Sequence, residues 1–228
     1  MADISFDVAL GLESTHALIT GASGAIGSVI VKAFLSAGAH VSAFDIAKPQ
    51  EPIAHKRLQL YQVDITDEDA LENAVETARG KFGLITTCVL AAGVDLSYCQ
   101  HHSLVDMPLQ EWRRILNVNV DGTFLTSRAW LRDIRSYATP QDRNISAIIF
   151  GSEAGTFGVP DCAAYAASKS AIQYGLVRSL ARDAVNIHSR CRINAVAPGP
   201  VATKQFEKEC DSNLAMLWQE AQATVALK

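Results

Sequence analysis

The sequence predicts an α/β fold in which a doubly wound parallel sheet carries helices on both faces. Three observations lead to this prediction. Short apolar runs alternate with longer stretches that have apolar residues every three or four positions. Several runs are apolar almost throughout, which is typical of strands buried between two helical layers. The 228 residues are 49% hydrophobic and 19% charged, enough for a large core and unlike the composition of disordered chains.

The expected elements follow one another in a regular alternation. The strand-like runs are residues 16–20, 40–45, 58–64, 84–91, 145–150 and 192–197. The helical stretches are residues 25–37, 67–81, 108–136 in two pieces, and 163–187. The least regular interior stretch, 94–107, follows the fourth strand. Loops at the carboxyl ends of parallel strands form the ligand crevice, so we expect this loop to border a site.

One domain spanning residues 1–228 is expected, because domains of this class run to roughly 250 residues and no linker divides the chain. The net charge of −4 without a strong basic cluster argues against a nucleic-acid partner. No apolar stretch reaches the roughly 18 residues of a membrane span. The five cysteines are widely spaced, which argues against structural metal and favours a reducing, cytoplasmic location.

Three glycines mark the turn between the first strand and the first helix. Gly21, Gly24 and Gly27 recur at every third position in the segment T-G-x-x-G-x-x-G. Glycines at such a turn let the backbone approach a pyrophosphate, which the helix N-terminus then stabilises. The turn therefore predicts a dinucleotide site.

Asp45 closes the second expected strand, 18 positions after Gly27. A carboxylate at this place accepts hydrogen bonds from the adenine ribose hydroxyls and repels a 2′-phosphate. Neither Ile46 nor Ala47 is an arginine that would hold that phosphate, although Lys48 lies close. We therefore expect NAD as the cofactor in preference to NADP.

Tyr165 and Lys169 stand four residues apart at the start of the last long helix, so both side chains lie on one face. Tyrosine has an ordinary pKa of about 10 and is a poor base at neutral pH. We expect the ammonium, together with a positive nicotinamide ring, to lower the pKa of Tyr165. Ser152 follows the fifth strand and is expected to bind a substrate oxygen at the same edge of the sheet.

Asn119 and Gly122 fall within the stretch 108–136, where both residue types are poor helix formers. The expectation is a local break of the helix that holds a water molecule.

Together these residues resemble the short-chain dehydrogenase/reductase family, single-domain branch, from about Thr15 to Thr203. The resemblance implies a Rossmann-like fold and a hydride transfer between NAD and an alcohol or ketone. It implies that Tyr165 exchanges the hydroxyl proton, Ser152 binds the substrate oxygen, Lys169 supports both the tyrosine and the ribose, and Asn119 anchors a water. The cofactor contacts that it implies are Gly21, Ser23, Gly24, Ala25, Ile26, Gly27, Asp45, Asp64, Ile65, Ala91, Ala92, Gly93, Tyr165, Lys169, Pro198, Gly199, Val201 and Thr203.

The chain departs from the family pattern in three places. Gly24 and Ala25 give a glycine spacing that resembles the extended branch, and Ala92 replaces the usual asparagine. The family continues with a further helix and a last sheet strand, whereas this sequence ends in an expected helix over 212–227. We interpret the segment 198–228 as a truncated substrate loop of a longer chain, with the C-terminal strand absent. The alternative is a naturally short form with an exposed sheet edge.

Two alternative functions stay open at this point. One is an NADPH-dependent 3-oxoacyl thioester reductase, which Asp45 disfavours. The other is a non-catalytic dinucleotide-binding scaffold, against which the intact Ser152, Tyr165 and Lys169 argue. The resemblance also implies a homodimer or homotetramer built on the helices 108–136 and 163–187.

Several other residues have simpler interpretations. His101 and His102 are expected in a polar loop instead of a metal site, and Cys162 as a packing residue instead of a redox-sensitive thiol. Trp112, Trp130 and Trp218 are expected in the core or an interface, with Trp218 facing the substrate.

Overall fold

A computed structural model describes residues 10–49 and 53–212, and every structural statement below refers to these residues. All strands of its sheet are parallel and follow the order β3-β2-β1-β4-β5-β6. Their bounds are β1 His16–Thr20, β2 His40–Asp45, β3 Leu58–Gln62, β4 Thr87–Leu90, β5 Ser146–Phe150 and β6 Arg192–Val196. The order reverses between β1 and β4, which is the switch point where such sheets bind ligands.

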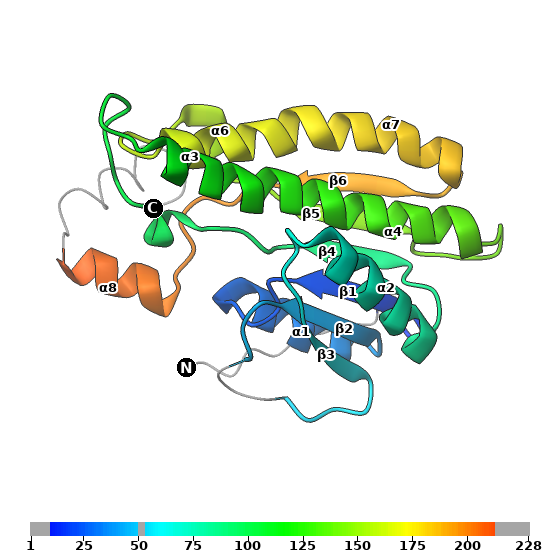
Figure 1. Cartoon of the computed structure of the whole chain (residues 1–228). Coiled ribbons are helices and arrows are strands. Elements are labelled where there is room, and N and C mark those ends of the chain that lie inside the picture. Colours follow the sequence, from blue (N-terminus) through cyan, green and yellow to red (C-terminus); the bar gives the residue numbers. More distant parts are fainter. Residues whose placement is uncertain (1–9, 50–52, 213–228) are drawn as a thin grey trace.

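Helices cover both faces of this sheet (Figure 1). The longer ones are α1 Ala25–Ser36, α2 Glu68–Phe82, α3 Leu109–Leu116, α4 Thr123–Tyr137, α6 Ala163–Ser170 and α7 Val177–Ile187. Side chains alternate between two cores: Leu18 packs with α2, α4 and α7, whereas the next residue, Ile19, packs with α1. The expected doubly wound α/β fold is thereby confirmed.

Most expected elements appear with shifted ends. The first two strands have the expected bounds. The strand β3 stops at Gln62, because Gln62 pairs with Asp45, which is the last residue of β2. Three short helices were not predicted: η1 Leu96–Tyr98, α5 Ala154–Phe157 and α8 Lys204–Ser212. The helix expected over 212–227 and Trp218 lie outside the described residues, apart from Ser212, which ends α8.

Two π-helical segments join the helices of one layer. The segment η2, Asn117–Gly122, connects α3 to α4, and η3, Ala171–Leu176, connects α6 to α7. The expected break of the helix at Asn119 is therefore wrong, because the chain stays helical there and only its turn is wider. Such wide turns are frequent at functional sites.

His16, the first residue of β1, is almost completely buried. Its Nδ1 lies 2.8 Å from the carbonyl oxygen of Gly83, and its Nε2 lies 2.9 Å from the hydroxyl of Ser42. Burial, with a smaller contribution from the nearby His40, lowers the pKa of His16 to about 4, although the hydrogen bond with Gly83 opposes this. The folded protein therefore holds this imidazole in its neutral form.

This burial makes stability depend on pH. The unfolded chain binds the proton with an ordinary pKa of about 6.5, so the unfolded state gains protons first as the pH falls. We expect His16 to have no destabilising effect above pH 6.5 and to cost about 3 kcal/mol of the free energy of unfolding once the pH reaches about 4. Urea unfolding between these pH values measures the slope. A His16→Asn variant with the same slope as the wild type would contradict this assignment.

Candidate active site

The glycine turn lies where β1 meets α1. Gly21 has a positive φ of 66°, and a Cβ there would lie 2.8 Å from the backbone of Ala92. A Cβ on Gly27 would lie 2.0 Å from the carbonyl oxygen of Gly21. Both positions therefore require glycine, the first for its conformation and the second for the close packing of helix on turn.

The start of α1 is open to an anion. Gly24 is its N-cap, no side chain caps this helix start, and no acidic residue stands in the first turn. Gly24 and Ala25 are exposed, and Ile26 is half-buried. Backbone N–H groups and the positive end of the helix dipole thus face solvent here, which fits a pyrophosphate.

The carboxylate of Asp45 accepts hydrogen bonds from two backbone amides, one in the glycine turn and one just after β2. The N–H of Ser23 donates to one carboxylate oxygen at 2.8 Å, and the N–H of Ala47 donates to the other at 2.8 Å. The hydroxyl of Ser23 donates to the carbonyl of Ala47 at 2.9 Å. A carboxylate oxygen accepts more than one hydrogen bond, so Asp45 retains capacity for ribose hydroxyls.

The next two expected contacts follow β3. Asp64 is exposed, and one of its carboxylate oxygens accepts from both the N–H and the hydroxyl of Thr66, each at 2.8 Å. Ile65 is buried, and a Cβ on Gly122 would lie 2.6 Å from its Cδ1. The side chain of Ile65 thus packs on the π-helical turn.

The residues that follow β4 contact both the end of β1 and the side chains of Asn119 and Lys169. The N–H of Ala92 donates to the hydroxyl of Thr20 at 3.2 Å, and Ala91 is half-buried beside it in the chain. A Cβ on Gly93 would lie 3.0 Å from Oδ1 of Asn119 and 3.7 Å from Nζ of Lys169. Glycine at this position permits the close approach of both side chains.

Asn119 ties three segments together. Its Oδ1 accepts from the N–H of Val94 at 2.7 Å, and its Nδ2 donates to the carbonyl of Val94 at 3.2 Å and to the hydroxyl of Ser168 at 3.0 Å. The carbonyl of Asn119 accepts from the hydroxyl of Thr123 at 2.7 Å. The buried side chain therefore fixes the loop after β4 against α6.

Ser152, Tyr165 and Lys169 are all buried at the carboxyl edge of β5. Ser152 hydrogen-bonds the phenol of Tyr165, and its N–H donates to the side-chain oxygen of Gln173 at 2.9 Å. Nζ of Lys169 lies 5.7 Å from the centre of the Tyr165 ring and donates to the carbonyl of Phe150 at 2.9 Å. The structure thus brings together the three residues that the sequence singled out.

The expected lowering of the pKa of Tyr165 depends on a nicotinamide ring as well as on Lys169, and it stays a prediction. Burial raises the pKa of Tyr165, the hydrogen bond from Ser152 opposes this, and Asp95, Cys99 and Cys162 raise it further. Burial also lowers the pKa of Lys169 to about 8, while Asp95 raises it. The spacing of the two residues predicted their proximity but could not predict their burial, which dominates both shifts.

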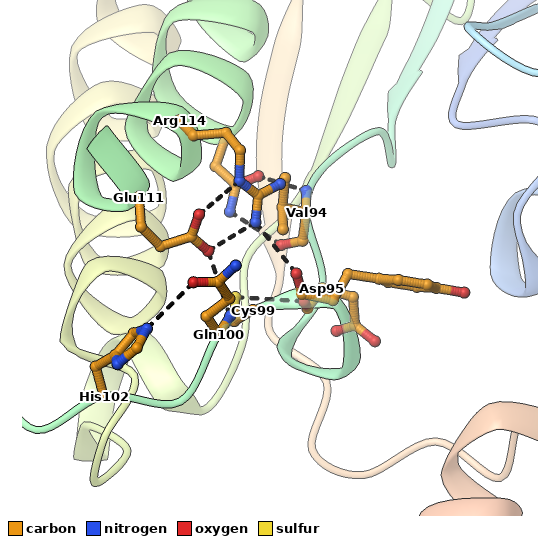
Figure 2. Close-up of polar contacts among 9 residues, drawn as sticks. Val94, Asp95, Cys99, Gln100, His102, Glu111 and Arg114 are labelled. Carbon is orange, nitrogen blue, oxygen red and sulfur yellow. Dashed lines mark hydrogen bonds and ion pairs between the residues drawn. The ribbon is translucent and has the colours of Figure 1, made fainter. Parts of the chain in front are cut away.

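The loop that follows β4 is fastened by a charge network that the sequence analysis missed (Figure 2). The buried carboxylate of Glu111 accepts from Nε and Nη2 of Arg114, each at 2.7 Å. It also accepts from the N–H of Gln100 at 3.3 Å, while Arg114 donates to the carbonyl of Tyr98 at 3.1 Å. The hydrogen bond from Arg114 lowers the pKa of Glu111. The i, i+3 spacing of opposite charges was the available signal.

Apolar side chains surround Tyr165. It shares a core cluster with Ile115 and Cys162, against which six half-buried residues pack. Those residues are Val94, Leu96, Cys99, Met107, Trp112 and Val159. The side chain of Tyr165 accordingly packs among apolar residues of the loop 94–107, while the carboxylate of Asp95 in the same loop raises the pKa of the phenol.

The segment after β6 reaches the same edge of the sheet. The carbonyl of Pro198 accepts from the N–H of Glu153 at 3.0 Å, and a Cβ on Gly199 would lie 2.9 Å from the Glu153 carboxylate. Val201 is exposed, and the hydroxyl of Thr203 accepts from the N–H of Phe206 at 3.1 Å at the start of α8. This segment therefore lies beside the loop of Ser152.

Two kinds of feature are missing from the portion of the chain that the structure covers. No cluster of three or more histidine, cysteine or acidic side chains within it has the geometry of a metal site. No helix within it combines the length and apolarity that crossing a membrane requires.

Comparison with known proteins adds an independent line of evidence. A family model described as short chain dehydrogenase matches residues 15–213. A 3-oxoacyl-[acyl-carrier-protein] reductase, FabG, of Thermotoga maritima is 32% identical over 204 residues, covering 86% of this chain and 78% of its own. An NADP-dependent (R)-specific alcohol dehydrogenase of Lentilactobacillus kefiri is 29% identical over 201 residues, covering 84% and 75%. A short chain dehydrogenase of Leptospira borgpetersenii with bound NAD+ superimposes with a TM-score of 0.73 at 25% identity, covering 86% and 76%.

Proposed function

Because the chain belongs to the short-chain dehydrogenase family, we propose that it is an NAD-dependent oxidoreductase that acts on a small to medium secondary alcohol or the corresponding ketone. The observation that carries the proposal is the buried group of Ser152, Tyr165 and Lys169, at the same sheet edge as the glycine turn. In this proposal one domain, residues 1–228, holds both the cofactor site and the catalytic residues.

The residues at the switch point fit a dinucleotide. Backbone amides of residues 25–27 would hold the pyrophosphate at the start of α1, and Asp45 would accept the adenine ribose hydroxyls. The adenine would contact Asp64 and Ile65, and residues 91–93 would form the floor of the cofactor site. Residues 198–203 would contact the nicotinamide end of the cofactor. When bound, the nicotinamide ring supplies or accepts the hydride.

The catalytic residues have separate tasks in this proposal. The hydroxyl of Tyr165 would give its proton to the carbonyl oxygen during reduction, or take it from the alcohol during oxidation. The hydroxyl of Ser152 would donate to the same oxygen and stabilise its developing charge. The positive charge of Lys169 would stabilise the phenolate, and Asn119 would hold the loop and α6 in register for these contacts.

The hydrophobic surroundings of Tyr165 support an apolar substrate. A panel of aliphatic, cyclic and aromatic secondary alcohols, incubated with NAD and followed by nucleotide reduction, tests the proposal. Turnover is expected to rise with the apolar surface of the alcohol, because burial of that surface contributes binding energy. Turnover of charged or strongly polar alcohols alone would contradict the proposed substrate class.

Asp45 is proposed to set the preference for NAD. Asp45→Asn keeps a carbonyl oxygen for one of the two amides but removes the charge that repels a 2′-phosphate. We expect the ratio of kcat/KM for NAD over NADP to fall at least about tenfold, which corresponds to about 1.4 kcal/mol. Steady-state kinetics with both nucleotides measures it, and an unchanged ratio would show that Asp45 does not determine the choice.

A second candidate function is the NADPH-dependent reduction of a 3-oxoacyl thioester. The relative from Thermotoga maritima, which is named as such a reductase, favours it. The charge of Asp45 beside the proposed ribose site disfavours it. Acetoacetyl thioester with NADPH or NADH distinguishes the two functions, because only the second predicts rapid oxidation of NADPH.

A homodimer or homotetramer is proposed for the assembled enzyme, in the cytoplasm. A groove of about 300 Å³ runs between α4 and α7 and combines apolar side chains with complementary charges. Its lining includes Phe124, Leu131, Leu180, Arg128, Arg132 and Asp183. A second copy would bury these apolar groups, and sedimentation equilibrium measures the resulting mass.

A further inference from the structure

A buried glutamine contacts the loop of Ser152. Gln173 is the third residue of the π-helical segment η3, and its side chain is buried. It follows Lys169 by four residues, as Lys169 follows Tyr165, which places these three side chains along one side of the same helical run. The tasks proposed above for the catalytic residues do not involve Gln173.

The amide of Gln173 holds the backbone of Ser152. Its Oε1 accepts from the N–H of Ser152 at 2.9 Å, and both groups are buried. Its Nε2 donates to the hydroxyl of Thr156 at 3.2 Å, and that hydroxyl lies 2.6 Å from the phenolic oxygen of Tyr174. Because a backbone N–H can only donate, the amide must present its oxygen to Ser152, and its orientation is thereby determined.

Two glycines leave room for this side chain. A Cβ on Gly151 would lie 2.2 Å from Oε1 of Gln173, and a Cβ on Gly155 would lie 2.9 Å from Nε2. Gly151 directly precedes Ser152, and Gly155 follows it by three residues. The loop of Ser152 therefore accommodates the amide at close range from both sides.

The remaining hydrogen bonds of Ser152 are local to its loop. Its Oγ accepts from the N–H of Ala154 at 3.2 Å, and its carbonyl accepts from the N–H of Gly155 at 3.0 Å. The hydrogen bond with Gln173, by contrast, connects the loop to a residue 21 positions away on another element. A hydroxyl that accepts from Ala154 can still donate its own proton, so the hydroxyl of Ser152 keeps its donor for a substrate oxygen.

We propose that Gln173 is a positioning residue, which holds the backbone of Ser152 so that the serine hydroxyl meets the substrate oxygen. The proposal rests on the proposed function, in which Ser152 donates to that oxygen. Gln173 itself contacts neither the substrate nor the cofactor in this account. Loss of its oxygen would leave the buried N–H of Ser152 without an acceptor, and we expect the loop to shift until the N–H finds another one.

Gln173→Met removes the amide and keeps an unbranched side chain of similar length. We expect kcat to fall about 10- to 100-fold, with KM changed by less than about threefold, because Ser152 stabilises charge that develops in the transition state. Gln173→Glu keeps an oxygen that accepts from Ser152, and kcat is expected to recover to within about fivefold of the wild type. A role in packing alone predicts the opposite order, since a buried site tolerates methionine better than glutamate.

Gln59→Met is the matched control for this substitution. Gln59 lies on β3, at the opposite edge of the sheet from β5 and β6, and its Nε2 donates to the carbonyl of Leu60 at 3.3 Å. The same loss of an amide there is expected to leave kcat and KM unchanged. Urea unfolding of all variants shows whether each one is folded under the conditions of the assay.

A double-mutant cycle identifies the residue through which Gln173 acts. In a Ser152→Ala background, Gln173→Met is expected to lower kcat by less than about twofold, because the hydroxyl that it positions is already gone. The full loss appearing again in that background would overturn the proposal. An unchanged kcat of Gln173→Met with Ser152 intact would overturn it as well.

The hydrogen bond itself can be measured without a substrate. Hydrogen exchange of the Ser152 amide, followed by nuclear magnetic resonance, is expected to be at least about tenfold faster in Gln173→Met than in the wild type. An unchanged exchange rate would overturn the proposal even in an active enzyme. A wild-type chain that turns over no alcohol would contradict the proposed function, and faster exchange in its Gln173→Met variant would still support the contact on which the positioning depends.

Discussion

Replacing Tyr165 by phenylalanine is expected to lower kcat by about 10²–10⁴-fold, the usual contribution of a positioned general acid or base. The substitution removes only the hydroxyl that hydrogen-bonds Ser152 and leaves the ring in its apolar cluster. Affinity for NAD is expected to stay unchanged, because the amides of the glycine turn and Asp45 are untouched. Stopped-flow kinetics and calorimetric titration of the same preparation measure the two quantities.

Tyr61→Phe provides the matched control. Tyr61 lies on β3, at the opposite edge of the sheet from β5 and β6, and its ring packs on Phe44 at 5.1 Å between centroids. The same loss of a hydroxyl there is expected to leave kcat unchanged. A Tyr165→Phe enzyme with kcat within about twofold of the wild type would contradict the assignment of the proton to this phenol.

Replacing Gly27 by alanine is expected to abolish nucleotide binding and to destabilise the fold. The new Cβ would lie 2.0 Å from the carbonyl oxygen and 2.7 Å from the carbonyl carbon of Gly21. Both atoms are backbone, so the turn itself must move, and overpacking of this kind costs about 1–3 kcal/mol or more. Urea unfolding measures the loss of stability, and calorimetry with NAD measures the loss of binding.

Gly80→Ala is the control for this substitution. Gly80 is an exposed position within α2, and a Cβ there would meet no atom within 4 Å. Alanine in a helix interior is more favourable than glycine by about 0.5–1 kcal/mol, so this variant is expected to be more stable and to bind NAD normally. A Gly27→Ala protein that binds NAD as the wild type does would contradict the proposed location of the pyrophosphate.

The architecture was readable from the sequence because its signals are local and periodic. The residues of β1 between His16 and Thr20 are all apolar, and the glycine turn separates this strand from a helix-period segment. The parallel pairing of the strands follows from the same pattern, since alternating strands and helices wind into a parallel sheet, whereas the order of the strands was not predicted. Element ends were less predictable, because they depend on where neighbouring strands stop pairing, as at Gln62.

The sequence predicted that Ser152, Tyr165 and Lys169 lie at one edge of the sheet, but it did not predict how deeply they are buried. Spacing placed Tyr165 beside Lys169, yet burial, which no spacing records, moves the pKa of the tyrosine up and that of the lysine down. The contacts of Glu111 with Gln100 and of Arg114 with Tyr98 depend on the course of the loop after β4. The amide of Asn119 likewise fixes Val94 and Ser168 through hydrogen bonds that only the folded chain brings together.

Titration of NAD(H) and NADP(H) into the wild-type chain by calorimetry tests the central claim most directly, because it requires no knowledge of the substrate. Asp45 and the open start of α1 predict binding at one site, with a dissociation constant on the order of micromolar for NAD(H) and at least about tenfold weaker binding of NADP(H). Absence of binding for both nucleotides would contradict the proposed dinucleotide site, and with it the proposed oxidoreductase.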